Sequence, residues 1–404
     1  MTETRTSSTR TPIPRGIART GPALFSYGFR PFFLAAGIWA VVAMALWIAY
    51  LTAGIGIGGS YGAAAWHAHE MLFGYTSAAL AGFLLTAVPN WTGRLPVSGR
   101  PLIGLILVWL AGRLALLFPD TLGLVPAMAV DAAFLPVLLA ICAREIVAGR
   151  KWKDLKILAV LAALSLGNIG FHLLVFGTGD IGFASRLAVG AYVMLIGIIG
   201  GRIVPSFTRN WLARNGATAL PASYSHLDTA ALLLGLCALA LWVVLPLAPV
   251  TAIACIIAGV LHAIRLWRWR GWTTGGERLV LVQHAGYVFV PLGFLLVAGS
   301  AIGRLEPVSA LHVFTVGAIG LMTLAVMSRA TRGHTGLPLT ASPVTAISYL
   351  MILVAALARP LAGLMPDFTV ELLALSGLCW IAGFSLFVAE YAPALIRRRR
   401  DRPA

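Results

Sequence analysis

The chain has 404 residues, of which 59% are hydrophobic and only 11% are charged, and its net charge is +16. A soluble domain would be less apolar, and an outer-membrane barrel would show short alternating segments instead of long apolar ones. The composition therefore indicates an all-α integral membrane protein, because helices satisfy their own backbone hydrogen-bonding groups in lipid. The basic excess follows membrane topology, so we expect no nucleic-acid partner.

The chain begins with a polar stretch, residues 1–24, that is rich in Ser, Thr and Arg. It is too polar for a signal peptide, so we expect a disordered cytoplasmic tail. Twelve apolar stretches follow within residues 25–396, each long enough to cross about 30 Å of hydrocarbon as a helix. They lie near residues 32–51, 66–88, 101–118, 122–147, 156–176, 181–204, 226–245, 247–266, 279–300, 308–329, 344–363 and 368–391. A second basic tail, residues 397–404, ends the chain.

Lysine and arginine residues distinguish the two sides of the predicted bundle. Of the 30 in the chain, all but four lie in the N-terminus, in every second connection or in the C-terminus. The four exceptions are Arg113, Arg186, Arg304 and Arg359. By the positive-inside rule, we expect both termini on the cytoplasmic side of the lipid bilayer.

The second, sixth and tenth spans share a short pattern that suggests internal repetition. Gly74, Gly190 and Gly317 recur at similar intervals, and Arg113 and Arg359 take matching places in the third and eleventh spans. The pattern predicts three repeats of four helices. Their approximate limits are residues 25–150, 151–271 and 272–396. By analogy alone, this is also the architecture of the haem–copper oxidases.

Ionisable side chains are costly in hydrocarbon, so those within the spans usually mark a cofactor or a pathway. One group lies in the outer half of the predicted membrane: His67, His69, His172, His312, Arg113, Arg186, Arg359 and Asp131. A second group lies toward the cytoplasmic side: His262, His284, His334, Arg202 and Arg329. A single histidine is often only a hydrogen bond between helices, but a cluster favours a functional role.

The predicted repeat places His69 and His312 at corresponding positions. Two imidazoles that face each other across a bundle can supply both axial ligands of a haem. Arg113 and Arg359, at one depth, suit its propionates because a guanidinium pairs well with a carboxylate, and Arg186 is a further candidate. The sequence therefore predicts a haem b site at these five residues.

Three features leave alternatives open. His67 lies two residues before His69, about 200° around a helix, so one metal ion cannot bind both unless the helix is unwound; the repeat favours His69. Asn168 lies one turn before His172 and either satisfies that imidazole or orients it as a metal ligand. Gly74 and its small neighbours either leave room for a flat macrocycle or allow close helix packing.

Several longer stretches resemble one known family. They are residues 27–33, 66–74, 82–93, 131–136, 201–211, 284–293, 312–320 and 327–336. In this order they resemble the NnrS family of nitric-oxide-response membrane proteins over almost the whole chain. The resemblance implies a multi-pass protein of the bacterial inner membrane that carries haem and copper. The recurring histidines of the family, each a potential metal ligand, match His67, His69, His172, His262, His284, His312 and His334.

Three functions are compatible with these features. The first is a haem- and copper-binding protein that relieves nitrosative stress or supports denitrification. It would act on NO or iron–nitrosyl species with an unknown electron donor. The second is a haem–copper-type NO reductase or oxidase. The third is a polytopic transporter.

The second and third functions make specific demands on the sequence. A haem–copper reductase needs three imidazoles on a second metal ion, but the sixth and seventh spans carry no mid-membrane histidine. A site around His262, His284 and His334 is the remaining option. A transporter would use Pro89 and Pro205 to break helices, but we favour helix termination at the membrane surface as the explanation of these prolines.

Overall fold

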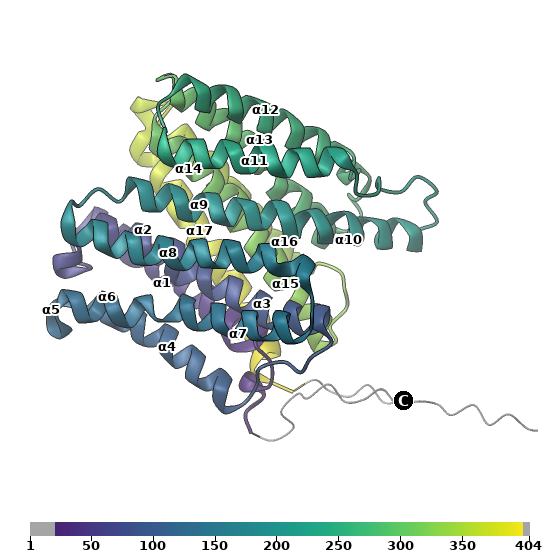
Figure 1. Cartoon of the computed structure of the whole chain (residues 1–404), viewed down its shortest axis with the longest axis horizontal. Helices are drawn as coiled ribbons and strands as arrows, with labels where there is room; N and C mark the ends of the chain where they lie inside the picture. Colours follow the sequence, from purple (N-terminus) through teal and green to yellow (C-terminus); the bar gives the residue numbers. More distant parts are fainter. Residues whose placement is uncertain (1–20, 399–404) are drawn as a thin grey trace, which may run out of the picture.

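The computed structural model describes residues 21–398, and every regular element in this range is a helix. Twelve helical stretches are long and apolar enough to cross a membrane, which confirms the predicted all-α fold and the number of spans. Figure 1 shows them packed side by side in one bundle, with their axes roughly aligned. The protein is therefore a multi-pass membrane protein. Most of the predicted tails, residues 1–24 and 397–404, lies outside the described range. A short 3₁₀ turn, η1 (Ala23–Phe25), begins at the inner end of the N-terminal tail.

Within the described range, eight spans are continuous α-helices. They are α1 (Phe29–Ala53), α4 (Arg100–Leu117), α8 (Leu155–Gly177), α11 (His226–Val244), α12 (Pro249–Trp267), α13 (Arg278–Ala301), α16 (Pro343–Leu361) and α17 (Thr369–Ile396). The fourth span joins α6 (Leu124–Ala132) to α7 (Phe134–Ala148) and follows the short helix α5 (Pro119–Leu122). Single 3₁₀ turns flank several spans: η2 (Gly59–Tyr61), η4 (Trp152–Asp154), η6 (Gly271–Thr273) and η8 (Pro366–Phe368).

The second, sixth and tenth spans each contain a π-helical segment between two α-helices. The second is α2 (Ala63–His69), η3 (Glu70–Tyr75) and α3 (Thr76–Thr92). The sixth is α9 (Gly182–Leu195), η5 (Ile196–Gly200) and α10 (Gly201–Arg214), and the tenth is α14 (Pro307–His312), η7 (Val313–Gly320) and α15 (Leu321–Thr335). Side chains of other spans bond to carbonyls in these wide turns: Trp109 Nε1 donates to Gly74 O (3.0 Å) and Arg265 Nη1 donates to Gly197 O (2.8 Å). Such segments are rare and frequently occur at functional sites.

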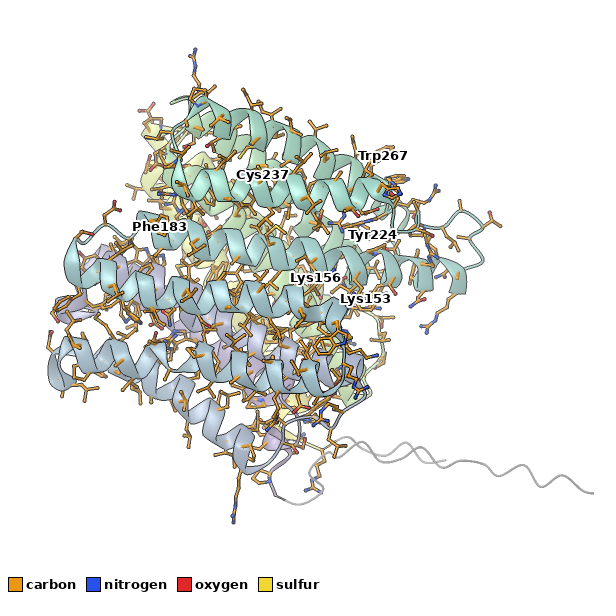
Figure 2. All side chains as sticks on the ribbon, in the orientation of Figure 1. Lys153, Lys156, Phe183, Tyr224, Cys237 and Trp267 are labelled. Atoms are coloured by element: carbon orange, nitrogen blue, oxygen red, sulfur yellow. The ribbon has the colours of Figure 1, made fainter. Side chains whose placement is uncertain are left out.

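The same three spans, together with α13, form the centre of the bundle. In its most apolar stretch of 18 residues, the second span is 83% buried, the sixth 61%, the ninth 67% and the tenth 72%. None of the other eight exceeds 44%. The outer helices present apolar side chains to the surroundings, as at Cys237 on α11 and Trp267 on α12 in Figure 2. The molecule therefore has a buried inner set of spans within a lipid-facing outer set.

Pro89 and Pro205, which were expected at helix ends, do not end their helices. Pro89 lies inside α3, and Pro205 lies inside α10, which continues to Arg214. The expectation that the sixth span ends near residue 204 is therefore wrong. A proline removes one backbone hydrogen bond, but here the helix continues and projects from one end of the bundle (Figure 1).

The first and last spans meet at one end of the bundle. The buried Arg30 side chain at the start of α1 donates hydrogen bonds to the carbonyls of Ala394, Leu395 and Arg397, at 3.0, 2.9 and 2.7 Å. The bonds to Ala394 and Leu395 satisfy two of the last carbonyl groups of α17, which have no partner within the helix, and the third bond reaches the residue that follows the helix. The two ends of the described chain therefore lie on the same side, as an even number of spans requires.

Candidate functional site

Five buried ionisable side chains meet where the second, third, fourth and fifth spans pack together. His69 ends α2, Glu70 begins η3, and the others lie on three different helices: Arg113 on α4, Asp131 on α6 and His172 on α8. All five are at most 3% exposed. We refer to these five residues as the histidine–carboxylate cluster.

Two imidazoles in this cluster converge on one carboxylate oxygen. His69 Nε2 lies 3.1 Å and His172 Nε2 lies 2.9 Å from Asp131 Oδ2. Each of the three residues offers a potential ligand atom, and these atoms all lie within 4.8 Å of one another. Among the described residues, no other group of three or more histidine, cysteine or acidic side chains meets this condition. The three atoms can therefore surround one small cation.

The remaining ring nitrogens of both imidazoles are held by neighbouring groups. His69 Nδ1 lies 3.1 Å from Glu70 Oε1, and His172 Nδ1 lies 2.9 Å from the Tyr61 hydroxyl. A histidine that binds a metal usually donates its other N–H to a carboxylate or a similar acceptor, which orients the ring. Both imidazoles of the cluster have this support.

Asp131 is also held from several directions. Arg113 forms an ion pair with the Oδ1 atom of Asp131, and its Nε lies 3.3 Å from Glu70 Oε2. Asn168 donates from Nδ2 to Asp131 Oδ2 (3.0 Å), and its Oδ1 lies 2.8 Å from His69 Nε2. The spacing in sequence suggested a partnership of Asn168 with the histidine one turn later, but Asn168 instead orients His69 and Asp131.

The charges in the cluster do not balance. It contains two carboxylates, Glu70 and Asp131, but only one guanidinium, Arg113. An uncompensated charge that is buried away from water costs several kcal/mol. The excess negative charge can be neutralised by one proton, on an imidazole or on a carboxylate, or by a metal cation.

Gly74 allows this close packing of charged groups. A Cβ atom at position 74 would lie 2.6 Å from Arg113 Nη1, 2.6 Å from Glu70 Oε2 and 2.7 Å from Trp39 Nε1. Trp39 Nε1 donates a hydrogen bond of 2.6 Å to Glu70 Oε2, so it fixes that carboxylate. The space beside Gly74, which the sequence suggested for a macrocycle, is filled by these three side chains.

Tyr61 closes the cluster from the loop before the second span. Burial raises the pKa of its phenol well above the usual value, and the negative charge of Glu70 raises it further, while Arg113 opposes the shift. Tyr61 is thus a neutral hydroxyl that can donate to His172 Nδ1 or accept from it.

A compact turn holds Tyr61 in place. Gly58 and Gly62 have φ angles of +71° and +84°, a region that favours glycine. The backbone N–H of Ser60 donates to both carboxylate oxygens of Asp120, at 3.0 and 3.3 Å. Hydrogen bonds from the Ser60 side chain and backbone lower the pKa of Asp120, so it is ionised and anchors the turn at neutral pH.

His67 and His312 belong to a second group near the same end of the second and tenth spans. The His67 ring stacks on Trp47, with 4.4 Å between centroids, and its Nδ1 is buried without a hydrogen-bond partner. His312 Nδ1 donates to Val308 O at 2.7 Å, which leaves Nε2 with a free lone pair. Arg359 lies within electrostatic range of both imidazoles.

This arrangement differs from the predicted pairing of His69 with His312. No contact among the described residues joins these two imidazoles, and His69 faces the cluster while His67 faces Trp47. Side chains two positions apart on a helix point in very different directions, so His67 and His69 belong to different groups. Arg113, predicted to bind a propionate, instead pairs with carboxylates of the protein.

His262 belongs to a separate network in the second half of the chain. Arg265 donates from Nε to Asp228 Oδ1 (3.0 Å) and from Nη1 to the Tyr287 hydroxyl (2.9 Å). His262 Nδ1 lies 2.8 Å from the same hydroxyl. Asp228 also completes a capping box with Ser225 at the start of α11. We refer to Asp228, His262, Arg265 and Tyr287 as the arginine–aspartate cluster.

The other predicted site residues lie apart. His284 Nε2 pairs with Thr208 Oγ1 at 2.8 Å, and His334 packs against the rings of Tyr27 and Phe29. The alternative site around His262, His284 and His334 therefore gains no support from the described contacts. Arg186 donates from Nη2 to Val243 O at 3.2 Å, away from the other candidates.

Sequence reasoning placed four members of the histidine–carboxylate cluster in the outer half but gave no role to Glu70 or Tyr61. The signal for Glu70 was present, since a carboxylate inside an apolar span is unusual and stands next to His69. No comparable signal marks Tyr61, because its position depends on the fold of the preceding loop.

The fold and the site define a class of protein: a polytopic membrane bundle with a potential metal centre buried between its spans. The chain matches the family described as NnrS protein over residues 23–399 and therefore belongs to the NnrS family. A comparison with curated proteins found no match. Membership supports a role in the nitric-oxide response in general terms.

Proposed function

We propose that the histidine–carboxylate cluster binds one copper ion and that the protein acts in the nitric-oxide response as a redox-active membrane protein. The observation that supports this most directly is the convergence of His69 Nε2, His172 Nε2 and Asp131 Oδ2. Imidazole and carboxylate ligands together suit Cu(II). A cation would also supply the positive charge that the buried cluster lacks.

Each residue has a defined part in this proposal. His69, His172 and Asp131 would hold the ion, while Glu70 and Tyr61 keep the two imidazoles in the required orientation. A bound copper ion would supply one-electron exchange and a coordination position for NO. The surrounding side chains exclude water, so the protein itself sets the polarity of the site.

We also propose that haem b is held at the second group, by His67 and His312, with Arg359 toward a propionate. Arg359 takes part in none of the ion pairs found among the described residues, although Glu306 acts on it electrostatically. The free Nε2 of His312 and the unpartnered Nδ1 of His67 fit ligand roles. His69 does not belong to this group, because its ring faces Glu70 and Asp131 in the histidine–carboxylate cluster.

For the whole bundle we propose three repeats of four helices in the bacterial inner membrane, with both termini cytoplasmic. The π segments in the second, sixth and tenth spans, and the central position of these spans, support the repeat. Lys153 and Lys156 lie at the end toward which α10 projects, while Phe183 lies toward the other end (Figure 2), in agreement with a basic cytoplasmic side. Impermeant maleimide should label Ser60→Cys in intact cells but Lys153→Cys only after lysis.

The copper proposal is tested by metal analysis of the purified full-length protein. We expect one copper ion per chain in the wild type and a loss of it in His172→Ala and Asp131→Asn. His226→Ala is the matched control, because His226 is exposed at the start of α11 and lies outside the clusters. Copper content equal to wild type in both cluster variants would overturn the proposal.

The role in the nitric-oxide response needs a separate test. Cells that depend on this protein should lose tolerance to an NO donor when they carry His172→Ala but keep it with His226→Ala. NO consumption by membranes supplied with an electron donor would then show whether the protein converts NO or only binds it. Equal tolerance to the NO donor in both variants would show that the histidine–carboxylate cluster is not needed for the nitric-oxide response.

A further inference from the structure

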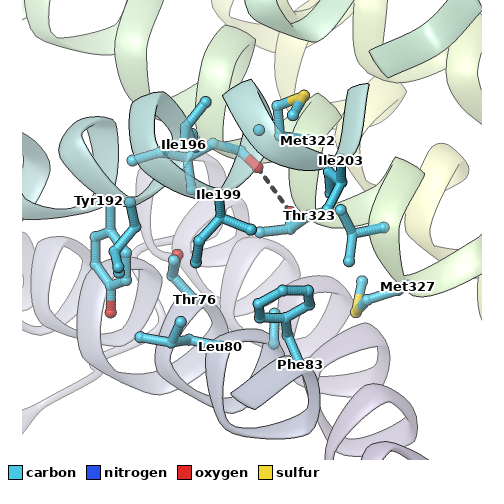
Figure 3. A pocket seen from close by; sticks show the side chains of 15 residues that line it. Thr76, Leu80, Phe83, Tyr192, Ile196, Ile199, Ile203, Met322, Thr323 and Met327 are labelled. Carbon is cyan, nitrogen blue, oxygen red and sulfur yellow. Dashed lines mark hydrogen bonds between the residues drawn. The ribbon is translucent and has the colours of Figure 1, made fainter. Parts of the chain in front are cut away.

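A cavity of about 90 Å³ lies between the three central spans that carry π segments. Figure 3 shows its walls, with side chains of α3 on one side, the sixth span on the second and α15 on the third. The lining is formed by Thr76, Ala79, Leu80, Phe83, Tyr192 and apolar residues around Ile199 and Met322. No charged side chain contributes to it.

The few polar groups of the wall already have partners in the protein. Thr76 Oγ1 donates to Met71 O (2.7 Å), Thr323 Oγ1 donates to Ile319 O (2.7 Å), and the Tyr192 hydroxyl donates to Leu72 O (2.8 Å). These hydroxyl groups have no hydrogen left to donate, so an acceptor group of a guest would lose its hydrogen bonds to water without replacement, at a cost of about 1–3 kcal/mol for each group. The cavity therefore favours an apolar guest.

The volume limits that guest to a small molecule. One water molecule needs about 10–15 Å³ of cavity volume. The cavity therefore has room for a few diatomic molecules but not for a ring system with substituents. An apolar cavity of this kind stays dry and accepts gases such as xenon. Nitric oxide is an uncharged diatomic molecule that dissolves readily in hydrocarbon.

The cavity is deep on one side and open on the other. Phe83, Ile203 and Val326 are partly exposed. Ala79 and Tyr192, which come earlier in their spans, are buried. The cavity therefore opens at the end nearer the close of α3, α10 and α15.

The closed side adjoins the histidine–carboxylate cluster. Tyr192 bonds to Leu72 in η3, the π segment that begins with Glu70, and lies within electrostatic range of Arg113. A guest at this side is thus separated from the cluster by the wall of one helix.

We propose that this central cavity binds small uncharged gas molecules and is the route by which NO reaches the buried cluster. The choice of NO as the natural guest rests on the proposed function, whereas binding of an inert gas does not. The satisfied polar groups, the volume and the position beside the cluster all favour this occupant over a lipid chain or a polar metabolite.

Xenon is the probe for the site itself. Crystals of the full-length protein pressurised with xenon should show an anomalous peak between Ala79, Ile199 and Met322. Ala79→Leu fills the cavity and should remove the peak, while Ala140→Leu, the same change on an exposed face of α7, should retain it. No peak in the wild type, or density for a lipid chain in its place, would overturn the proposal.

The rate at which NO alters the spectrum of the metal-loaded protein tests the route. We expect Ala79→Leu to slow this reaction severalfold and Ala140→Leu to leave it unchanged. An equal rate in Ala79→Leu, combined with a xenon peak in the wild type, would contradict the route but leave the copper proposal intact. A wild type that binds xenon but no copper would contradict the proposed function and the delivery role, while the gas site would stand.

Discussion

Two of the buried charged clusters in the described part of the chain use similar residues differently. In the arginine–aspartate cluster, Asp228 pairs with the buried Arg265 at 3.0 Å and with the partly exposed Arg268 at 3.4 Å, and Arg265 also bonds to Tyr287 and to the Gly197 carbonyl. In the histidine–carboxylate cluster, two carboxylates share one guanidinium, and two imidazole nitrogens point at one oxygen atom of Asp131. In the first network the carboxylate is fully paired with guanidinium groups, whereas in the second the carboxylates outnumber the guanidinium groups by one.

This difference separates a structural network from a potential binding site. A buried ion pair whose hydrogen bonds are all made mainly specifies how helices pack. A cluster with converging acceptors and excess negative charge is complementary to a cation that it does not itself contain. Variants of the two clusters should therefore have opposite effects on stability and on metal content.

The largest effect on stability is expected in the arginine–aspartate cluster. Asp228→Ala leaves Arg265 buried without its carboxylate and removes a helix cap, so the free energy of unfolding should fall by about 3–5 kcal/mol. Copper content per folded chain should not change. Thermal unfolding in detergent and metal analysis measure both, with the exposed Glu371→Ala as control. A wild-type melting temperature in Asp228→Ala would remove the structural role from this network.

A smaller effect, on affinity, is expected from the partner of His69. Glu70→Gln keeps the shape of the side chain but removes the charge that orients the imidazole, so copper affinity should fall by about 10–100-fold. Glu145→Gln changes another buried carboxylate, which lies on α7 and pairs with Arg94 of the loop after α3, and should leave affinity unaltered. Competition with a copper chelator measures both, and equal affinities would exclude Glu70 from the site.

The partner of His172 should contribute less. Tyr61→Phe removes one neutral hydrogen bond, worth about 1 kcal/mol, so copper affinity should fall roughly fivefold. Tyr50→Phe, at an exposed position of α1, is the matched control. If the loss in Tyr61→Phe exceeds that in Glu70→Gln, the order of importance assigned to the two partners is wrong.

The smallest effect concerns the turn that carries Tyr61. Because the pKa of Asp120 is lowered below its ordinary value of 3.8, its anchoring is complete above that value and is lost as the pH falls through the lowered pKa. Hydrogen exchange at the Ser60 amide, corrected for intrinsic rates, should therefore show constant protection from about pH 7 to about pH 5. Asp120→Asn should exchange faster over this whole range. Equal protection in the variant would show that Asp120 does not anchor the turn.

The spans could be predicted because membrane crossing depends on the length and apolarity of a segment, which the sequence displays directly. The end of the sixth span could not, because Pro205 was expected to stop a helix that continues to Arg214. The sequence also cannot reveal a π segment, because one inserted residue changes neither the apolar composition of a span nor its overall periodicity enough to be recognised. Three such segments lie in the central spans.

The site could be predicted only in part. Depth along a span placed His69, His172, Arg113 and Asp131 in one layer, and the structure brings these four together. Depth does not determine which direction a side chain faces around its helix. The repeat therefore paired His69 with His312, whereas the contacts direct His69 toward Asp131.

The most direct test of the central claim is pulsed electron paramagnetic resonance of the full-length protein loaded with Cu(II). The account predicts couplings from two imidazole nitrogen atoms in the wild type, and from one at most in His172→Ala if that variant retains any copper. A spectrum without imidazole coupling, or couplings that persist unchanged in both His69→Ala and His172→Ala, would contradict it.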